Sequence, residues 1–411
     1  MTAPGRVVIV GGGVAGVSTA AALRAGGYAG DLVLVERSEF PYDRPPLSKA
    51  YLAGAQDLEQ IALQRPDWYV EQRVTLVGRA EVVDLKPSDA QVRIQLADGT
   101  VSDADQVVLA SGGRPAVPPI PGIDATRDAR RLHVLRDADD ADRLRAALRP
   151  GTRLLVVGGG LIGAESASTA RELGCHVTMV DPVDPPLIGA LGPAVAQWLH
   201  GQHTDHGVDT VTTVLESLRP TSSGVAARLR GESADREFDA VLVGVGMMPH
   251  TGLAAAARLE VDRGVLVDNA QVTSHPRILA VGDCARMRGH DRSEHWEAAQ
   301  LDGRRAAATI LGVAAPAPTA PWWWSDRYGR HVEGVGQLTG PDAGIRHIVR
   351  GKIGPAPFAV FAVRDDRIVG AVAIDDSQAL RAARRLIDRA VAVDPARLAD
   401  TGTDLRKLLR G

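Results

Sequence analysis

The sequence has few cysteines and no long apolar run, and these two absences exclude several classes of protein. Its 411 residues include only two cysteines, Cys175 and Cys284, which form no Cys-x-x-Cys pair. We therefore expect two buried thiols in a reducing cytoplasm, and neither a disulfide framework nor a dithiol redox centre. The longest apolar runs have the length of a strand, so no segment is expected to span a bilayer. No signal peptide is expected either, because a strand-like run begins at Val7.

Charge is nearly balanced along the chain. The formal net charge is -3, with 24% charged and 45% hydrophobic residues, which is ordinary for a globular protein. This balance argues against general binding of nucleic acids or of membrane surfaces. A chain of this length is expected to form about two or three domains.

Two glycine-rich loops are the most informative feature. Gly11–Gly16 (GGGVAG) follows the apolar run Val7–Val10, and Gly158–Gly163 (GGGLIG) follows Leu154–Val157. Each loop fits G-x-G-x-x-G between a strand and a helix, which is the context that the motif needs. The glycines let the backbone approach a pyrophosphate, and the helix N-terminus offers N–H donors to it. Two such loops predict two dinucleotides, and a protein that holds two usually passes electrons between them.

An acidic residue follows each loop where a carboxylate can bind an adenosine ribose. Glu36 and Asp181 lie about 20 residues beyond the last glycine of their loops. We interpret the first loop with Glu36 as an FAD site and the second loop with Asp181 as an NADH site. A carboxylate repels a 2′-phosphate, and residues 181–187 contain no Arg or Lys, so NADH is favoured over NADPH. A glycine turn without a ligand is the alternative for either loop taken alone.

The segment Tyr42–Lys49 (YDRPPLSK) and the acid Glu165 are further candidates for chemistry. Arg44 and Lys49 are cations that can neutralise a pyrophosphate or a flavin, and exposed charges on a loop are the alternative. We place Glu165 in the first turn of the second loop's helix. There it is either a capping acid or a contact of the nicotinamide amide, paired with Lys49 from the other domain.

Three other features have competing interpretations. Gly282-Asp283 places a carboxylate on a ribityl chain or is only a turn. Trp322–Trp324 cannot all face one core from a strand, so at least one is expected at an interface or against a flat ligand such as a flavin. The polar stretch His200–His206 has a metal-like spacing but no cysteine, and we expect a solvated helix end there.

Together these motifs resemble the ferredoxin reductases of bacterial oxygenase systems, over essentially the whole chain. Leu135-Arg136 with Asp140-Ala141 is similar to the family's L-R-x-x-x-D-A, whose Arg binds FAD. His295–Gln300 is similar to a Trp motif of part of the family. The other matching segments are the FAD fingerprint, Y-x-R-P-x-L-S-K, G-G-G-x-I-G-x-E, the second FAD motif and P-W-F-W-S-D, at residues 7–16, 42–49, 158–165, 280–285 and 321–326.

The resemblance implies an α/β fold of two Rossmann-like nucleotide-binding domains, like those of glutathione reductase, and a small α+β C-terminal domain. The FAD-binding domain would comprise residues 1–114 and 239–316, the NADH-binding domain residues 115–238, and the C-terminal interface domain residues 317–411. NADH would deliver a hydride to flavin N5, and the flavin would pass single electrons to a [2Fe–2S] ferredoxin that serves a P450 or Rieske oxygenase. Lys49 and Glu165 are then the pair expected near N5.

The resemblance also implies partners. Hydrophobic and basic surface near the flavin would dock the acidic ferredoxin. No nucleic acid or membrane partner is expected, and the chain is expected to be a cytoplasmic monomer or weak dimer.

The predicted site residues form two sets, with Lys49 and Glu165 as the predicted catalytic pair and no metal. The FAD set is Gly11, Gly13, Val14, Ala15, Gly16, Glu36, Arg37, Arg44, Lys49, Ala110, Ser111, Gly112, Arg136, Gly282, Asp283, Trp296 and Trp322. The NADH set is Gly158, Gly160, Leu161, Ile162, Gly163, Glu165, Asp181 and Gly246.

The sequence departs from the family at three places. Ser111 replaces a Thr and keeps the hydroxyl, and Asp181 replaces the usual Glu with the same charge. After Asp326, residues Arg327–Glu333 depart from the family's D-Q-Y followed by an apolar strand with an inward Gln, a change that bears on partner identity and flavin-edge contacts.

Two other functions stay open. An NADH oxidase, peroxidase or disulfide reductase would need a redox cysteine near the flavin, and the segment Tyr42–Lys49 has none. A redox sensor of the apoptosis-inducing-factor type would share the fold and both cofactors but turn over slowly.

Overall fold

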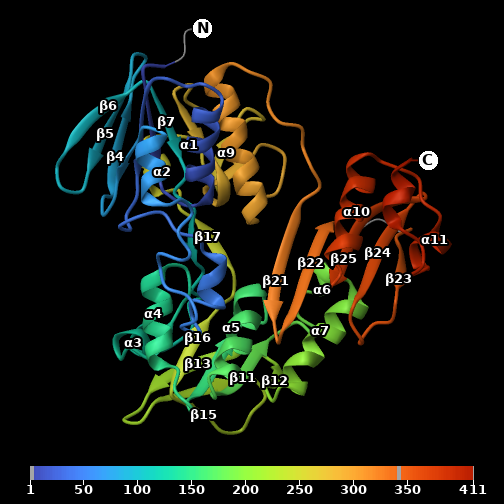
Figure 1. The fold of residues 1–411 in the computed structure, drawn as a ribbon. Helices are drawn as coiled ribbons and strands as arrows, with labels where there is room; N and C mark the ends of the chain where they lie inside the picture. The colour runs from blue at the N-terminus through green and yellow to red at the C-terminus, as the bar shows by residue number, and fades with distance from the viewer. Residues whose placement is uncertain (1–3, 340–343, 411) are drawn as a thin grey trace. The chain divides into compact units, whose positions relative to one another are not determined.

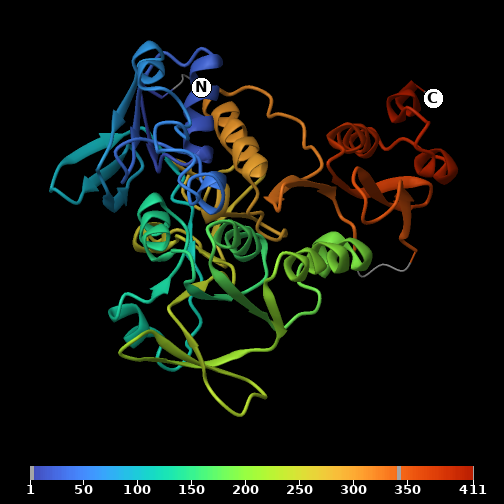
Figure 2. The same cartoon turned by 60° about the horizontal axis from the view of Figure 1, so that its bottom comes forward.

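The computed structural model describes residues 4–339 and 344–410, and their contacts divide the chain into two compact units. The first unit comprises Met1–Arg44, Asp57–Arg114 and Met247–Pro318. The second comprises Pro45–Gln56, Pro115–Gly246 and Thr319–Gly411. The ribbon in Figures 1 and 2 shows the elements of each unit, which are described separately below.

A five-stranded parallel sheet in the order β19-β7-β1-β2-β3 forms the centre of the first unit. Its strands are runs of Val, Ile and Leu because helices and other strands cover both faces. The long helices α1 and α9 pack against each other, and their alanines and leucines join one core cluster. The sheet strands are β1 (Arg6–Val10), β2 (Asp31–Val35), β3 (Val74–Val77), β7 (Gln106–Leu109) and β19 (Ile278–Ala280), and the helices are α1 (Val14–Ala25), α2 (Pro66–Glu71), α8 (Gly252–Ala256) and α9 (Trp296–Leu311).

Smaller strands complete the first unit. A three-stranded antiparallel sheet covers the other face of the central sheet, and a turn at Asp98-Gly99 joins two of its strands. The remaining elements are β4 (Val82–Pro87), β5 (Val92–Leu96), β6 (Val101–Ala104), β8 (Gly113–Pro115), β17 (Met247–Pro249), β18 (Val265–Val267), β20 (Ala285–Met287) and the 3-10 turn η2 (Gly282–Cys284).

The second unit contains another five-stranded parallel sheet, in the order β12-β11-β10-β16-β9. Helix α5 follows β10 as α1 follows β1, so the chain repeats one plan. The elements are η1 (Pro45–Ser48), α3 (Ile123–Asp128), β9 (Leu132–His133), α4 (Ala138–Ala147), β10 (Arg153–Val157), α5 (Leu161–Glu172), β11 (His176–Asp181), α6 (Ile188–Leu191), α7 (Pro193–Asp205), β12 (Asp209–Thr212), β13 (Leu215–Pro220), β14 (Val225–Leu229), β15 (Arg236–Phe238) and β16 (Ala240–Val243).

An antiparallel sheet in the order β21-β22-β25-β24-β23 follows in the same unit. Helix α10 packs an apolar stripe that includes Leu380 and Leu386 against one face, and residues of α7 pack against the other. Asp376 caps α10 by accepting a hydrogen bond from the amide of Ala379 at 3.0 Å. The elements are β21 (Trp322–Arg327), β22 (Arg330–Gly336), β23 (Arg346–Arg350), β24 (Phe358–Arg364), β25 (Arg367–Ile374), α10 (Ser377–Asp388), α11 (Pro395–Ala399) and η3 (Leu405–Arg410).

These sheets confirm the predicted fold class of two Rossmann-like domains with a small α+β domain. Strand β16 concerns the predicted boundary between the NADH-binding domain and the second part of the FAD-binding domain. The sequence places that boundary between residues 238 and 239, but β16 pairs in parallel with β10 in the second sheet. The second unit continues to Gly246, so we draw that boundary after β16.

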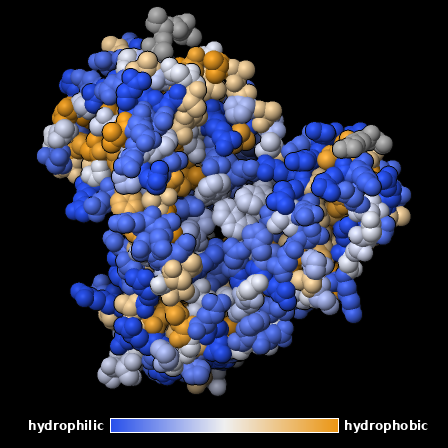
Figure 3. Space-filling model, viewed as in Figure 1, coloured by the Kyte–Doolittle hydropathy of each residue, from blue (hydrophilic) through white to orange (hydrophobic). Residues whose placement is uncertain are grey.

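The surface in Figure 3 is mainly hydrophilic on the face shown, with apolar side chains in small, separate groups. Among residues 4–339 and 344–410, no helix combines the length and the apolar character needed to cross a membrane.

Phe361 tests how much the C-terminal sheet depends on its core. Its ring is fully buried in the cluster between the sheet and α10. We expect Phe361→Ala to destabilise this domain by about 3–5 kcal/mol, because the change removes apolar burial and leaves a cavity. Urea unfolding followed by circular dichroism measures the shift. Val349→Ala, at an exposed position of the edge strand β23, is the control, and equal shifts for both variants would contradict the packing argument.

Candidate functional site

The first glycine loop has the shape that a pyrophosphate site needs. Gly11 has φ +110°, and a Cβ there would lie 2.3 Å from the carbonyl oxygen of Ala110. A Cβ on Gly16 would lie 2.0 Å from the carbonyl oxygen of Gly11, so helix and strand approach too closely for a side chain. Helix α1 has no side-chain cap and no acid in its first turn. Its N-terminal amides are therefore suited to an anion.

Two predicted FAD residues flank this loop. The carboxylate of Glu36 accepts hydrogen bonds from the amides of Gly12 and Ser38, so the loop holds it at the end of β2. The guanidinium of Arg44 lies over Gly13, because a Cβ on that glycine would be 2.7 Å from Nη1. Arg37, beside Glu36, is exposed. The Arg44 guanidinium thus lies at the positive end of the α1 dipole, and both positive charges would stabilise an anionic ligand bound there.

The second predicted FAD motif meets the first. Gly282 has φ +67°, and a Cβ there would lie 2.8 Å from Cβ of Ala15 in α1. The turn η2 therefore brings Asp283 to the start of α1. The amide of Gly282 donates to Asp302 of α9 at 3.2 Å. Burial raises the pKa of Asp302 to about 6. Sequence reasoning missed this aspartate, which has no motif of its own.

The other predicted FAD residues of the first unit lie on loops around the sheet. Ser111 follows Ala110 at the end of β7 and donates to the carbonyl of His250 at 3.0 Å. Gly112 follows with φ +65°. The indole of Trp296, at the start of α9, donates to Asp43 at 2.8 Å.

The second glycine loop repeats the geometry of the first. Gly158 has φ +102°, and a Cβ on Gly163 would lie 2.0 Å from the carbonyl oxygen of Gly158. Helix α5 also begins without a side-chain cap. Gly246, with φ +109°, follows the neighbouring strand β16. Leu161 and Ile162 are the first two residues of α5.

Asp181 ends β11 beside this loop, where sequence spacing places it. Its two carboxylate oxygens accept hydrogen bonds from the amides of Gly159 and Val183, each at 2.8 Å. Apolar side chains stand exposed around the same loop: Ile162, Val183 and Val245 are each more than 40% exposed. Exposed apolar groups around a polar loop are typical of a ligand site.

Both loops therefore fit the dinucleotides that the sequence predicts. In each unit, glycines leave room for a backbone approach, a helix N-terminus lacks a cap, and a carboxylate is held at the adjacent strand end. A glycine turn without a ligand would need no uncapped helix and no oriented carboxylate.

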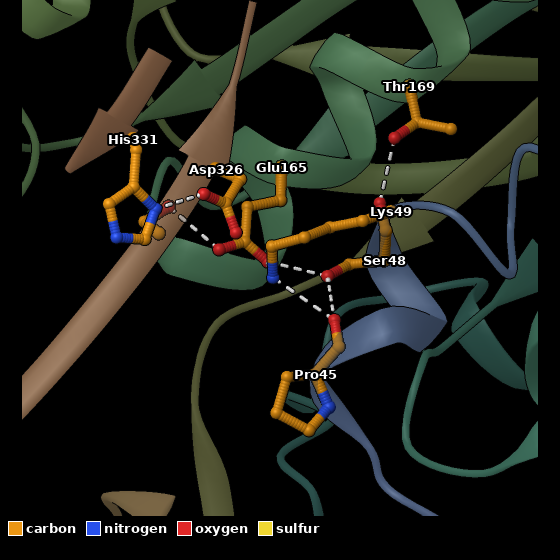
Figure 4. A network of polar contacts seen from close by, with 8 residues as sticks. Pro45, Ser48, Lys49, Glu165, Thr169, Asp326 and His331 are labelled. Atoms are coloured by element: carbon orange, nitrogen blue, oxygen red, sulfur yellow. Dashed lines mark hydrogen bonds and ion pairs between the residues drawn. The ribbon is translucent and has the colours of Figure 1, made fainter. Parts of the chain in front are cut away.

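The predicted pair of Lys49 and Glu165 is present in the second unit (Figure 4). Nζ of Lys49 lies 2.7 Å from Oε2 of Glu165 and also donates to the carbonyl of Pro45 at 3.0 Å. Glu165 is only 5% exposed. Ser48 donates to the same Oε2 at 2.5 Å, and Ser325 donates to Oε1 at 2.7 Å. The structure corrects one expectation, because Glu165 lies beyond the first turn of α5 and is not a capping acid.

The three tryptophans divide between two faces, as predicted. Trp322 and Trp324 stack with ring centroids 5.0 Å apart, and the Trp322 indole donates to Glu333 at 3.2 Å. Trp323 lies on the opposite face over Gly334. Trp322 and the half-buried Arg136 belong to the second unit, whereas most of the predicted FAD set belongs to the first.

The histidine stretch is not simply a solvated helix end. His203 is buried, with Nδ1 2.6 Å from the Tyr328 hydroxyl and Nε2 3.3 Å from Nη1 of Arg327. Burial and the charge of Arg327 lower the pKa of His203 to about 2. His206, exposed, stacks on Tyr328. Residues 4–339 and 344–410 hold no group of three or more His, Cys, Asp or Glu arranged for a metal.

The fold and the two loops define a flavoprotein-type oxidoreductase with two dinucleotide sites. The chain belongs to the pyridine nucleotide-disulphide oxidoreductase family, which it matches over residues 5–303. Residues 322–409 match a second family, described as reductase C-terminal.

Relatives that match over nearly their full length identify a narrower group within this family. The chain is 36% identical to putidaredoxin reductase of Pseudomonas putida, with 100% of this chain and 98% of the relative covered. It is 38% identical to the ferredoxin--NAD(+) reductase subunit of the benzene 1,2-dioxygenase system of the same species, with 98% and 97% covered. The reductase in the covalent putidaredoxin reductase–putidaredoxin complex matches with a TM-score of 0.91 at 34% identity, over 100% of this chain and 99% of that one.

The raised pKa of Asp302 predicts that the free energy of unfolding depends on pH. Its folded pKa of about 6 lies above the ordinary value of 3.8, so ionisation costs folding free energy that is absent below pH 4 and complete above pH 6. We expect FAD-loaded Asp302→Asn to gain about 1–3 kcal/mol over the wild type at pH 8, and the gain to vanish toward pH 4. Urea unfolding at several pH values measures it.

The exposed Asp291 of the same unit supplies the control variant Asp291→Asn. A stability difference for Asp302→Asn that is constant with pH would contradict the assignment.

Proposed function

We propose that this protein is an NADH-dependent ferredoxin reductase that passes electrons from NADH through FAD to a [2Fe–2S] ferredoxin serving a P450 or Rieske oxygenase. The ion pair between Lys49 and the buried Glu165, which lies on the helix of the second glycine loop, carries the proposal. The full-length relatives support it, because they include reductases of both kinds of oxygenase system.

The first unit holds FAD in this proposal. The amides at the start of α1 and the guanidinium of Arg44 bind the pyrophosphate, Glu36 binds the adenosine ribose, and Asp283 binds the ribityl chain. FAD, when bound, supplies the chemistry that accepts a hydride and releases single electrons. The protein contributes binding, orientation and electrostatics around it.

The second unit holds NADH. The start of α5 binds its pyrophosphate, and Asp181 accepts hydrogen bonds from the adenosine ribose. Glu165 orients the nicotinamide through its amide group. Lys49 keeps the buried carboxylate in place, because a charge with 5% exposure needs a partner.

Other acceptors are less well supported. Both cysteines are free and fully buried, and burial raises the pKa of each thiol, so neither is suited to thiolate redox chemistry. This counts against a disulfide reductase, a peroxidase or an NADH oxidase with a redox cysteine. A slow redox sensor shares these loops and is separated from a reductase by kinetics.

Domain limits, location and assembly belong to the same proposal. The FAD-binding domain takes residues 1–114 and 247–316, the NADH-binding domain 115–246, and the C-terminal domain 317–411. We place the protein in the cytoplasm, where free thiols persist and NADH is supplied. It acts as a monomer or weak dimer.

Anaerobic stopped-flow spectroscopy tests the reaction. NADH is expected to bleach the flavin rapidly, and a [2Fe–2S] ferredoxin mixed in next should be reduced as the flavin reoxidises. Lys49→Ala should slow the first step at least about 10-fold, because Glu165 loses its charged partner. The exposed Lys86→Ala is the control.

Rapid bleaching without transfer to any of several ferredoxins, with a persistent charge-transfer band, would instead favour the sensor. An unchanged first step in Lys49→Ala would remove this lysine from the proposed mechanism.

Asp181 predicts the coenzyme preference. The double variant Asp181→Ala/Pro182→Arg removes a carboxylate and adds a cation where a 2′-phosphate would lie. We expect the NADPH-to-NADH ratio of kcat/KM to rise at least about 10-fold. Affinity for both coenzymes should fall, because Asp181 also holds two loop amides, so the ratio is the measured quantity. Asp184→Ala is the control, and an unchanged ratio in the double variant would place the ribose elsewhere.

A further inference from the structure

The first strand of the C-terminal sheet turns polar side chains inward. Along β21, Ser325 and Arg327 are buried, at 0% and 5% exposure. Trp324, before Ser325, and Asp326, between the two buried residues, are half-buried. This alternation is that of a strand with one covered face. The covered face lies against helix α5, which follows the second glycine loop.

Ser325 contacts the centre of the site directly. Its hydroxyl donates to Oε1 of Glu165 at 2.7 Å. Oε2 of the same carboxylate accepts hydrogen bonds from the Ser48 hydroxyl and the Lys49 ammonium group. Within residues 4–339 and 344–410, no other side chain forms a hydrogen bond to Oε1. Donors on both oxygens hold the plane of the carboxylate, so Ser325 restricts its rotation about the last side-chain bond.

Contacts beyond Ser325 anchor the strand without contacting Glu165. The turn after β21 uses Tyr328 at φ 53° and Gly329 at φ 69°. The amide of Tyr328 donates to the hydroxyl of Ser168 on α5 at 2.9 Å, and its own hydroxyl lies against His203 of α7. Arg327 has no acceptor atoms, so it donates to Nε2 of His203, and the proton of the neutral imidazole is on Nδ1.

We propose that Ser325 is a positioning residue for flavin reduction by NADH, acting through Glu165. The hydroxyl holds Oε1, which keeps Oε2 on Lys49 and presents the carboxylate in a single orientation to the nicotinamide amide. The C-terminal domain thereby completes the hydride-transfer site as well as offering a surface to a partner. This inference rests on the role proposed for Glu165.

The test is single-turnover flavin reduction by NADH in the FAD-loaded enzyme, with the limiting rate and the NADH dissociation constant measured separately. Ser325→Ala should lower the limiting rate about 5- to 50-fold and change the dissociation constant much less. Ser325→Thr, which keeps the hydroxyl, should restore most of the rate. Ser168→Ala loosens the same contact between β21 and α5 but leaves Glu165 untouched, so it should stay within about twofold of wild type.

A double-mutant cycle tests the role of Glu165 separately from the role of Ser325. If Ser325 acts through Glu165, then Ser325→Ala should have no further effect on the limiting rate in a Glu165→Ala background. A normal rate in Glu165→Ala alone would overturn the role of Glu165. A slow Glu165→Ala with a normal Ser325→Ala, or with independent effects of the two changes, would overturn the role of Ser325. Equal losses in Ser168→Ala and Ser325→Ala would also overturn it, because they would mean loosened packing.

Discussion

The buried carboxylate of Glu165 is the constraint on which the second unit depends. A carboxylate taken out of water loses several kcal/mol of solvation, and partners must replace it. Those partners come from two other chain segments, at residues 45–49 and on β21, while the helix α5 supplies Glu165 itself. The stretch Pro45–Gln56 belongs to this unit although the chain on both sides of it belongs to the first. The ion pair and the hydrogen bond from Thr169 to the carbonyl of Ser48 join that short stretch to α5.

The second constraint is the close approach of backbone segments within each of the two glycine loops. A Cβ on Gly16 or Gly163 would lie 2.0 Å from a carbonyl oxygen of its own loop. No rotation of a side chain relieves that overlap, because Cβ is fixed to the backbone. The same local geometry therefore recurs in two sheets, and in each sheet a carboxylate at the next strand end holds a loop amide. The functional difference between the loops comes from what surrounds them.

Features encoded by neighbours in sequence were predictable, and features that depend on distant contacts were not. The two loops, Glu36 and Asp181 follow from spacing along single βαβ units, and both parallel sheets confirm the βαβ arrangement. The Lys49–Glu165 contact was predicted, whereas the contacts of Ser325 and His203 were not, although Ser325 lies in the segment that is similar to P-W-F-W-S-D and His203 in the histidine stretch. That motif does not show that the fold brings the Ser325 hydroxyl to 2.7 Å from Glu165. His203 was assigned to a solvated helix end because the sequence does not show that Arg327 and Tyr328 cover it.

The departure from the family pattern at residues 327–333 also introduces a buried cation, Arg327. Its guanidinium is buried, and among the described residues it forms no ion pair, yet burial lowers its pKa only to about 10, so it stays charged at neutral pH. The carboxylate whose charge acts on it is Glu165. Cross-strand pairing places His331 and Glu333 on the opposite face of the sheet, with Trp324. The unusual segment therefore changes the electrostatics inside the nucleotide-binding unit on one face and the aromatic surface on the other. Its inward part carries the charge of Arg327, which acts on Glu165, the carboxylate that we propose orients the nicotinamide.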